Sequence, residues 1–322
     1  MNFWVYKLSF STELHIGNGL LTDSCYTMYA DSFFSALCLE ALKIYGVEGI
    51  EKLKTMAMED KLVLSDGFPY IKDKLYIPKP LDTTFLNPYC EVKQDTSVQR
   101  KTWKKTKYLP LEIWNKNDSK LDVEKELENL KGIGWSSLRI RASIQGLEET
   151  MPYGVGGFQF VKDNGMYFIV GLEKEVEEIF DNILNSLQYT GIGGKLSTGM
   201  GKFQWSKEEA SNDVKERLCY AEQSGAETNL MTLSVSFPNE DSENVFENSY
   251  YSVIKRSGFV SSLNYTSRQK DVSGFTKKKN LYVIQSGSCM SHGYCGDIID
   301  VSDGGAHEVL RYAKPLFWRL EQ

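Results

Sequence analysis

The chain has 322 residues, 41% of them hydrophobic and 12% aromatic, which is enough for one large or two medium domains with well-packed cores. Its formal net charge of −6 excludes a protein drawn to nucleic acid by its overall field, so any such binding depends on local basic segments. Six scattered cysteines without a Cys-x-x-Cys motif predict no disulfide framework and, with only three histidines, no metal site. No signal peptide or membrane-spanning run is visible, so we expect a cytoplasmic protein without a membrane partner.

The first part of the chain alternates strand and helix patterns. Residues 3–10 are rich in aromatic and β-favouring side chains and predict a strand. Asp31 is a candidate N-cap for an amphipathic helix that Gly46 ends. Three short strand patterns follow this helix, at 62–64, 68–71 and 75–77.

Between about 81 and 152 the regular pattern gives way to a polar insertion. Its residues 93–107 contain six bases and one acid, a net charge of +5 within an acidic chain. An aromatic side chain among bases is typical of single-stranded RNA binding, whereas a solvated loop is the alternative. The candidate RNA-binding residues of the insertion are Lys101, Trp103, Lys104 and Lys105, followed by Arg139 and Arg141 near its end.

After the insertion, the patterns 158–161 and 166–170 flank Asp163-Asn164-Gly165 and predict a β-hairpin with a type I′ turn. An amphipathic helix is expected around 176–187, and a strand around 201–205. The predicted elements therefore come in the order strand, helix, strands, hairpin, helix and strand. This is compatible with the βαββαβ order of a ferredoxin-like unit that carries a long insertion.

A glycine-rich segment, 191–203, lies between that helix and the last strand. Glycine reaches positive φ at little cost and lets the backbone approach a ligand closely, and the lysines and hydroxyls suggest an anion. The spacing fits neither a Walker A motif nor a dinucleotide fingerprint, so no nucleotide cofactor is indicated. A tight connection without a ligand is the alternative. The candidate residues are Gly191, Gly193, Gly194, Lys195, Ser197, Thr198, Gly199 and Gly201.

The rest of the chain begins with a polar stretch, 206–229, which we interpret as a linker. A β-rich region, 230–322, follows it. Within this region, residues 255–279 contain seven bases and one acid, a net charge of +6, and begin with the candidate RNA contacts Lys255 and Arg256.

Several segments, in this order along nearly the whole chain, resemble the RAMP superfamily of CRISPR proteins. More narrowly, they are similar to the family of fourth subunits of the type III-A Csm effector complex. The segments that carry the resemblance are 15–17 (His-Ile-Gly), 29–37, 191–203, 255–260, 287–288 and 307–312.

This resemblance implies an α+β protein with two ferredoxin-like (RRM-like) RAMP domains, 1–205 and 230–322. It also implies a non-catalytic subunit that grips the repeat-derived 5′ tag of the CRISPR guide RNA (crRNA). Such a subunit joins the large polymerase-type subunit of the Csm complex to its backbone subunit three. In this scheme His15 and Gly17 are further RNA contacts, and the basic insertion acts as a thumb across the guide.

Two alternatives stay open. A related RAMP class cuts CRISPR repeats, and His15 is the residue that could serve it as an acid or base near neutral pH. No partner base for His15 is evident, so a binding or structural role is favoured. The sibling subunit that caps the 3′ end of the guide shares the glycine-rich loop and is the second alternative.

Overall fold

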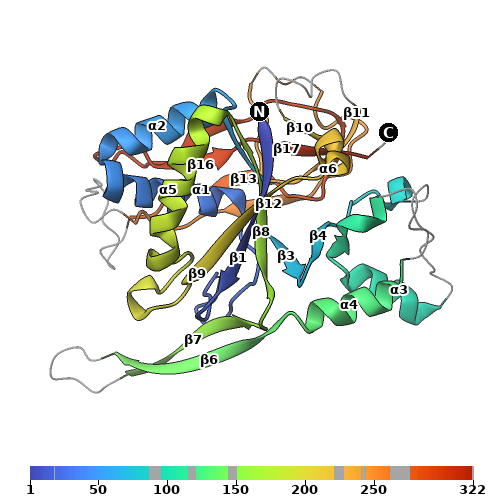
Figure 1. Cartoon of the computed structure of the whole chain (residues 1–322), viewed down its shortest axis with the longest axis horizontal. Helices are drawn as coiled ribbons and strands as arrows, with labels where there is room; N and C mark the ends of the chain where they lie inside the picture. The colour runs from blue at the N-terminus through green and yellow to red at the C-terminus, as the bar shows by residue number, and fades with distance from the viewer. Residues whose placement is uncertain are drawn as a thin grey trace.

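The computed structural model describes residues 1–17, 19–86, 96–114, 121–143, 151–220, 228–240, 242, 244–261 and 276–320. A seven-stranded antiparallel sheet occupies its centre (Figure 1). The strand order is β5-β4-β3-β8-β1-β9, and β2 pairs with β8 beside β3. The strands are β1 (Asn2–Phe10), β2 (Leu62–Leu64), β3 (Phe68–Ile71), β4 (Lys74–Pro78), β5 (Tyr108–Pro110), β8 (Asn164–Leu172) and β9 (Phe203–Glu209).

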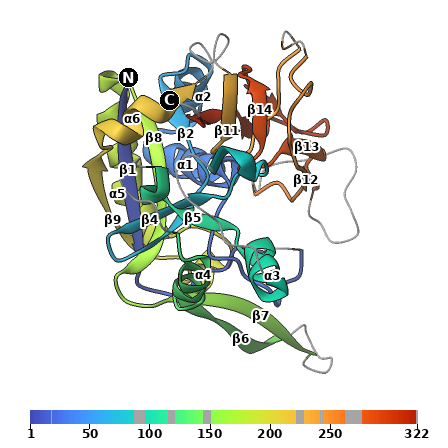
Figure 2. The same ribbon diagram turned by 90° about the vertical axis from the view of Figure 1, so that its right-hand side faces the viewer.

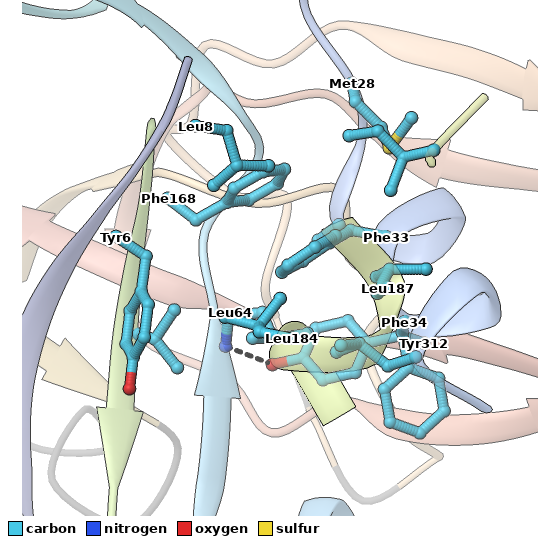
Figure 3. Close-up of a cluster of buried hydrophobic side chains, with 14 of the residues drawn as sticks. Tyr6, Leu8, Met28, Phe33, Phe34, Leu64, Phe168, Leu184, Leu187 and Tyr312 are labelled. Atoms are coloured by element: carbon cyan, nitrogen blue, oxygen red, sulfur yellow. Dashed lines mark hydrogen bonds between the residues drawn. The ribbon is translucent and has the colours of Figure 1, made fainter. Parts of the chain in front are cut away.

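Two helices cover one face of this sheet, α1 (Ala30–Tyr45) and α5 (Lys174–Thr190), and α2 (Val47–Met58) packs against α1. Side chains alternate between the two faces of a strand, so Tyr6 and Leu8 of β1 point toward the helices. There they meet Phe33 of α1 and Leu184 of α5 in the core shown in Figure 3. The amphipathic patterns predicted for both helices are confirmed, because each buries one apolar stripe.

The other face of the sheet is covered by the insertion and by the second half of the chain. Phe3 and Val5 of β1 belong to this second core. Trp114 from the insertion and Trp318 near the C-terminus join it, with ring centroids 6.1 Å apart. Both faces of the central sheet are therefore buried.

The insertion contains more regular structure than its polar sequence predicts. It holds α3 (Ser97–Lys105), β5, α4 (Val123–Lys131) and a long hairpin of β6 (Gly134–Ser143) and β7 (Met151–Phe160). This hairpin projects from the body of the molecule (Figures 1 and 2). The predicted hairpin between 158–161 and 166–170 is wrong: β7 pairs with β6, whereas β8 pairs with β1, β2 and β3. In this turn the positive φ falls on Asp163.

The second half consists of strands. Its four-stranded sheet has the order β10-β17-β11-β14, and two two-stranded sheets, β12–β13 and β15–β16, accompany it. The strands are β10 (Leu218–Tyr220), β11 (Thr228–Thr232), β12 (Val253–Arg256), β13 (Leu281–Ile284), β14 (Cys289–His292), β15 (Asp297–Asp300), β16 (Leu310–Ala313) and β17 (Leu316–Arg319). The described residues after 228 form no helix. None of the described helices is long and apolar enough to cross a membrane.

The stretch interpreted as a linker, 206–229, is instead built into both sheets over its described part. Its first residues continue β9 along β1, and α6 (Asn212–Arg217) then leads into β10. Val214 and Leu218 are buried in the core beneath. Residues 221–227 lie outside the described residues.

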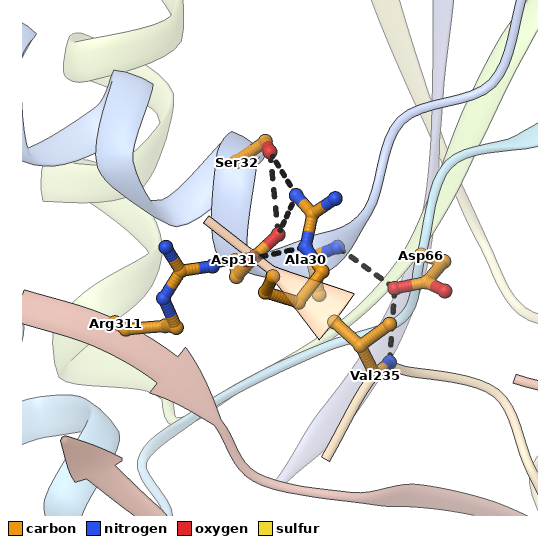
Figure 4. Close-up of polar contacts among 7 residues, drawn as sticks. Ala30, Asp31, Ser32, Asp66, Val235 and Arg311 are labelled. Carbon is orange, nitrogen blue, oxygen red and sulfur yellow. Dashed lines mark hydrogen bonds and ion pairs between the residues drawn. The ribbon is translucent and has the colours of Figure 1, made fainter. Parts of the chain in front are cut away.

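A buried charge cluster joins the two halves at the start of α1 (Figure 4). The Asp31 carboxylate, with a side chain only 3% exposed, accepts hydrogen bonds from Arg256 of β12 at 2.8 and 2.9 Å and from Arg311 of β16 at 2.5 Å. Burial alone would raise the pKa of Asp31, but the two guanidinium groups outweigh it and lower the pKa. The prediction that Asp31 caps the helix is wrong, because Tyr29 holds the N-cap position and the carboxylate is committed to the arginines.

A second buried carboxylate, Asp66, bridges the halves through the backbone. Its Oδ1 atom accepts the N–H of Ala30 at 2.8 Å and the N–H of Val235 at 3.1 Å. Burial raises the pKa of Asp66 to about 7, although these two hydrogen bonds act in the opposite direction.

We therefore expect the contribution of Asp66 to the free energy of unfolding to fall as pH rises from about 4 to about 7. Over that range the unfolded chain loses the Asp66 proton and the folded chain retains it. Asp66→Asn keeps an acceptor oxygen but cannot ionise, so it should remove this part of the pH dependence. At pH 8 the variant should be more stable by up to about 4 kcal/mol, since one pKa unit corresponds to about 1.4 kcal/mol. Urea unfolding from pH 4 to 8 measures both effects, and identical pH slopes in the two proteins would contradict them.

Candidate nucleic-acid interface

The glycine-rich loop between α5 and β9 packs against residues 11–15, the segment that follows β1. The N–H of Gly201 donates to the Glu13 carbonyl at 2.7 Å, and the N–H of Gly194 donates to the His15 carbonyl at 2.7 Å. A third bond joins the N–H of Ser11 to the Lys202 carbonyl at 3.0 Å. Backbone hydrogen bonds thus fix the loop along residues 11–15, as they would fix a neighbouring strand in a sheet.

The other edge of the same segment is bonded to β7 of the projecting hairpin. Leu14 and Phe158 exchange backbone hydrogen bonds of 2.9 and 2.8 Å. The His15 ring is 7% exposed, and its Nδ1 donates to the Gly156 carbonyl at 2.7 Å. His15 therefore connects two elements: its backbone carbonyl is bonded to the glycine-rich loop, and its ring is bonded to the hairpin.

Glycine is needed in the loop because backbone approaches backbone. A Cβ at Gly201 would lie 2.0 Å from the Ile192 carbonyl oxygen, and one at Gly193 would lie 2.5 Å from the His15 carbonyl oxygen. At Gly199, φ is also positive, but nothing lies within 4 Å of the Cβ position. The sequence predicted that the loop backbone approaches a ligand closely. At Gly201 and Gly193 it instead approaches other backbone atoms of the same chain.

The exposed surface beside the loop carries positive charge and one aromatic ring. Directly paired residues of a β-hairpin share a face, so Arg139, Arg141 and Tyr153 lie on the same face of β6–β7. The Lys195 ammonium lies 5.9 Å from the centre of the Tyr153 ring, and Arg139 pairs with Glu13 at 2.7 Å. Ser197 and Thr198 are exposed at the tip of the loop.

The structure therefore brings together most of the residues predicted in the first half. Those that share this surface, or lie directly beneath it, are His15, Gly17, Arg139, Arg141 and the candidate residues of 191–201. Sequence reasoning missed Tyr153 and Glu13. The glycines at 154, 156 and 157 were the available signal, because a Cβ at Gly156 would lie 2.2 Å from the Thr22 carbonyl oxygen.

The basic helix α3 lies on the other side of the molecule from the glycine-rich loop (Figure 1). Its Lys101, Lys104 and Lys105 are exposed. The prediction that Trp103 offers a stacking surface is wrong, because the side chain is 6% exposed. Its ring is covered by the ammonium group of Lys79, the residue that follows β4, at 4.4 Å from the ring centre, and this contact joins α3 to the end of β4.

Of the two candidate residues of β12, one is exposed and the other is engaged in a contact within the protein. Lys255 is exposed. Arg256 donates to both carboxylate oxygens of Asp31 from Nε and Nη2, which form one edge of its guanidinium group, and the group lies over the Tyr29 ring, 4.4 Å from its centre. The predicted RNA contact by Arg256 is therefore corrected to a structural ion pair, because this edge of the guanidinium group is bonded to a carboxylate.

Comparison with known proteins defines the family of this chain. The family model described as the RAMP superfamily matches residues 7–204, and the model described as the CRISPR Csm4 C-terminal domain matches residues 226–320. The Csm4 protein of Mycobacterium tuberculosis is 31% identical over 100% of this chain and 99% of its own length. That of Streptococcus thermophilus is 30% identical over 100% of both chains. The chain belongs to the Csm4 family of the RAMP superfamily.

Solved structures agree on the fold. A chain in the crystal structure of the Csm3–Csm4 subcomplex superimposes with a TM-score of 0.64 at 20% identity, covering 100% of both chains. A chain in the crystal structure of the Csm1–Csm4 cassette in complex with AMPPNP gives a TM-score of 0.59 at 18% identity, covering 100% of this chain and 98% of that one.

Two glycines of the loop form a matched pair for testing the packing. Gly199 and Gly201 have nearly the same φ, 81° and 77°, so alanine carries the same conformational cost of about 1–2 kcal/mol at either position. Only at Gly201 does the Cβ collide with a backbone oxygen. We expect Gly201→Ala to lower the free energy of unfolding by about 1–3 kcal/mol more than Gly199→Ala. Equal losses in urea unfolding would contradict the packing described here.

Proposed function

We propose that this chain is a non-catalytic guide-RNA-binding subunit of a type III-A CRISPR interference complex, and that it grips the repeat-derived 5′ tag of the guide. The observation that supports this most is the shared surface formed by the glycine-rich loop and one face of the β6–β7 hairpin. Lys195, Arg141 and the exposed Ser197 hydroxyl supply donors for phosphates and 2′-hydroxyls. The Thr198 hydroxyl donates to the Lys195 carbonyl at 2.7 Å and offers an acceptor oxygen for a 2′-hydroxyl. Tyr153 supplies a ring on which a base can stack.

We propose further that the chain joins the large polymerase-type subunit to backbone subunit three, and that it acts in the cytoplasm. The role as a junction is supported by similar solved structures, one of which is a Csm3–Csm4 subcomplex and another a Csm1–Csm4 cassette. The exposed lysines of α3 and Lys255 are proposed as additional RNA contacts outside the loop surface.

The ferredoxin-like interpretation is proposed for the first domain. Its antiparallel order β9-β1-β8-β3, with α1 and α5 as the connecting helices, supports it. For the second domain this interpretation lacks support, since the described residues after 228 contain strands but neither of the two helices that such a unit requires. The boundaries 1–205 and 230–322 remain predictions.

The double variant Lys195→Ala/Arg141→Ala tests the loop surface. Each lost phosphate contact should reduce the slope of log affinity against log salt by about 0.7 for a single strand. We expect weaker binding of repeat-derived guide RNA and a slope lower by about 1.4, measured by fluorescence anisotropy from 50 to 300 mM salt.

The matched control is Lys52→Ala/Lys174→Ala, which removes the same charge from exposed positions on α2 and α5. This control should leave affinity and slope close to those of the unchanged chain. Equal effects of both double variants would show that only the net charge matters and would refute the proposed surface.

The absence of catalysis is also a proposal, supported by the position of His15. Its Nδ1 is committed to the Gly156 carbonyl and its ring is buried beneath the loop, which suits a residue that fixes structure. Purified protein incubated with repeat RNA in EDTA should leave the RNA intact. Site-specific cleavage that His15→Ala abolishes would establish a repeat endoribonuclease in place of the binding subunit.

A further inference from the structure

The charge cluster between the two halves contains more positive than negative groups. The Asp31 carboxylate is shared by two guanidinium groups, those of Arg256 and Arg311. A third cation, Lys278, lies beside the residues that directly follow β12, the strand of Arg256, since its N–H donates to the Gly258 carbonyl at 2.9 Å. Lys278 is half-buried, and none of the carboxylates in the described part of the chain pairs with its ammonium group.

The neighbouring groups do not neutralise this excess charge. Asp66 is the other acid near the cluster, and its raised pKa leaves it only partly ionised at neutral pH. The Cys38 thiol on α1 has a pKa of about 12, raised mainly by burial, and is therefore uncharged. The net charge of the cluster thus lies between +1 and +2.

Two observations show that the positive charge is incompletely satisfied. Arg311 is 5% exposed, and its buried Nε has no hydrogen-bond partner among the described residues. The pKa of Lys278 is lowered, first by burial and then by repulsion from the nearby Arg311 and Arg256. A bound anion would offset the repulsion that these groups now experience.

The surroundings favour a polyanion over a single carboxylate of a partner protein. The described segments that flank the cluster, 253–261 and 276–279, contain five bases and no acid. The five are Lys255, Arg256, Lys277, Lys278 and Lys279. Of these, Arg256 is paired with Asp31, and the N–H of Lys279 donates to the Val301 carbonyl at 2.9 Å, next to Asp300. Such a sequence suits the repeated charges of a nucleic-acid backbone.

We propose that this cluster is a second RNA-binding site, separate from the glycine-rich loop, in which Lys278 contacts a backbone phosphate of the guide. Arg256 and Arg311 do not contact the RNA in this arrangement. They are held by Asp31, and their field strengthens the attraction of the site for an anion. The inference rests on the proposed guide-RNA-binding function and adds a contact from the second half of the chain.

The variant Lys278→Met tests the site, because methionine retains an unbranched apolar chain and removes the charge. We expect about threefold to tenfold weaker binding of repeat-derived RNA to the full chain and a salt slope lower by about 0.7. Lys52→Met removes one exposed charge from α2 and should change neither quantity.

The stability of Lys278→Met without RNA is a second test, and for this quantity the proposed site predicts no loss. A lysine that serves the fold would destabilise the protein when replaced, whereas loss of a repelled, desolvated charge should leave the midpoint of urea unfolding without RNA unchanged or raised. Unchanged RNA affinity and slope in Lys278→Met, or a lowered unfolding midpoint, would overturn the second site while the loop surface could still bind. Failure of the unchanged chain to bind guide RNA would overturn the proposed function together with it.

Discussion

The fold depends on one buried carboxylate. Asp31 accepts hydrogen bonds from two guanidinium groups that come from strands more than two hundred residues away, Arg256 of β12 and Arg311 of β16. Removing one member of a buried ion pair leaves an uncompensated charge and typically costs about 3–5 kcal/mol. The same junction brings Tyr312 into the core of the first half, where its hydroxyl accepts the N–H of Leu64 at 2.9 Å (Figure 3). The two halves therefore stabilise each other and form one body.

A second constraint shapes the proposed RNA surface. Residues 11–15 form hydrogen bonds with the glycine-rich loop along one edge and with β7 along the other, so loop and hairpin cannot move independently without breaking backbone bonds. Such a surface is organised before the ligand arrives, which reduces the entropy lost on binding. The segment that holds the loop follows β1 directly, so the loop surface is anchored to the central sheet.

The sequence predicted what local patterns determine. The strand at 3–10, the helices that became α1 and α5, and the position of the glycine-rich loop all follow from periodicity and glycine content, and the structure confirms them. Features that depend on distant partners were not predictable. The sequence predicts an RNA contact at Arg256, but in the structure this side chain pairs with Asp31, 225 residues earlier. The sequence likewise predicts a stacking surface at Trp103, but Lys79 and the second core cover the ring. The glycines indicated a close backbone approach, but not that the nearest backbone belongs to residues 13–15.

We propose that the guide RNA lies along the surface shared by the loop and the hairpin. Ultraviolet cross-linking of the assembled complex can test this placement, with photoreactive nucleotides placed separately in the repeat-derived tag and at the far end of the spacer. We expect tag nucleotides to cross-link to Tyr153 and to peptides from 191–203. Cross-links to these peptides from the 3′ end of the guide alone, or from neither end, would contradict it.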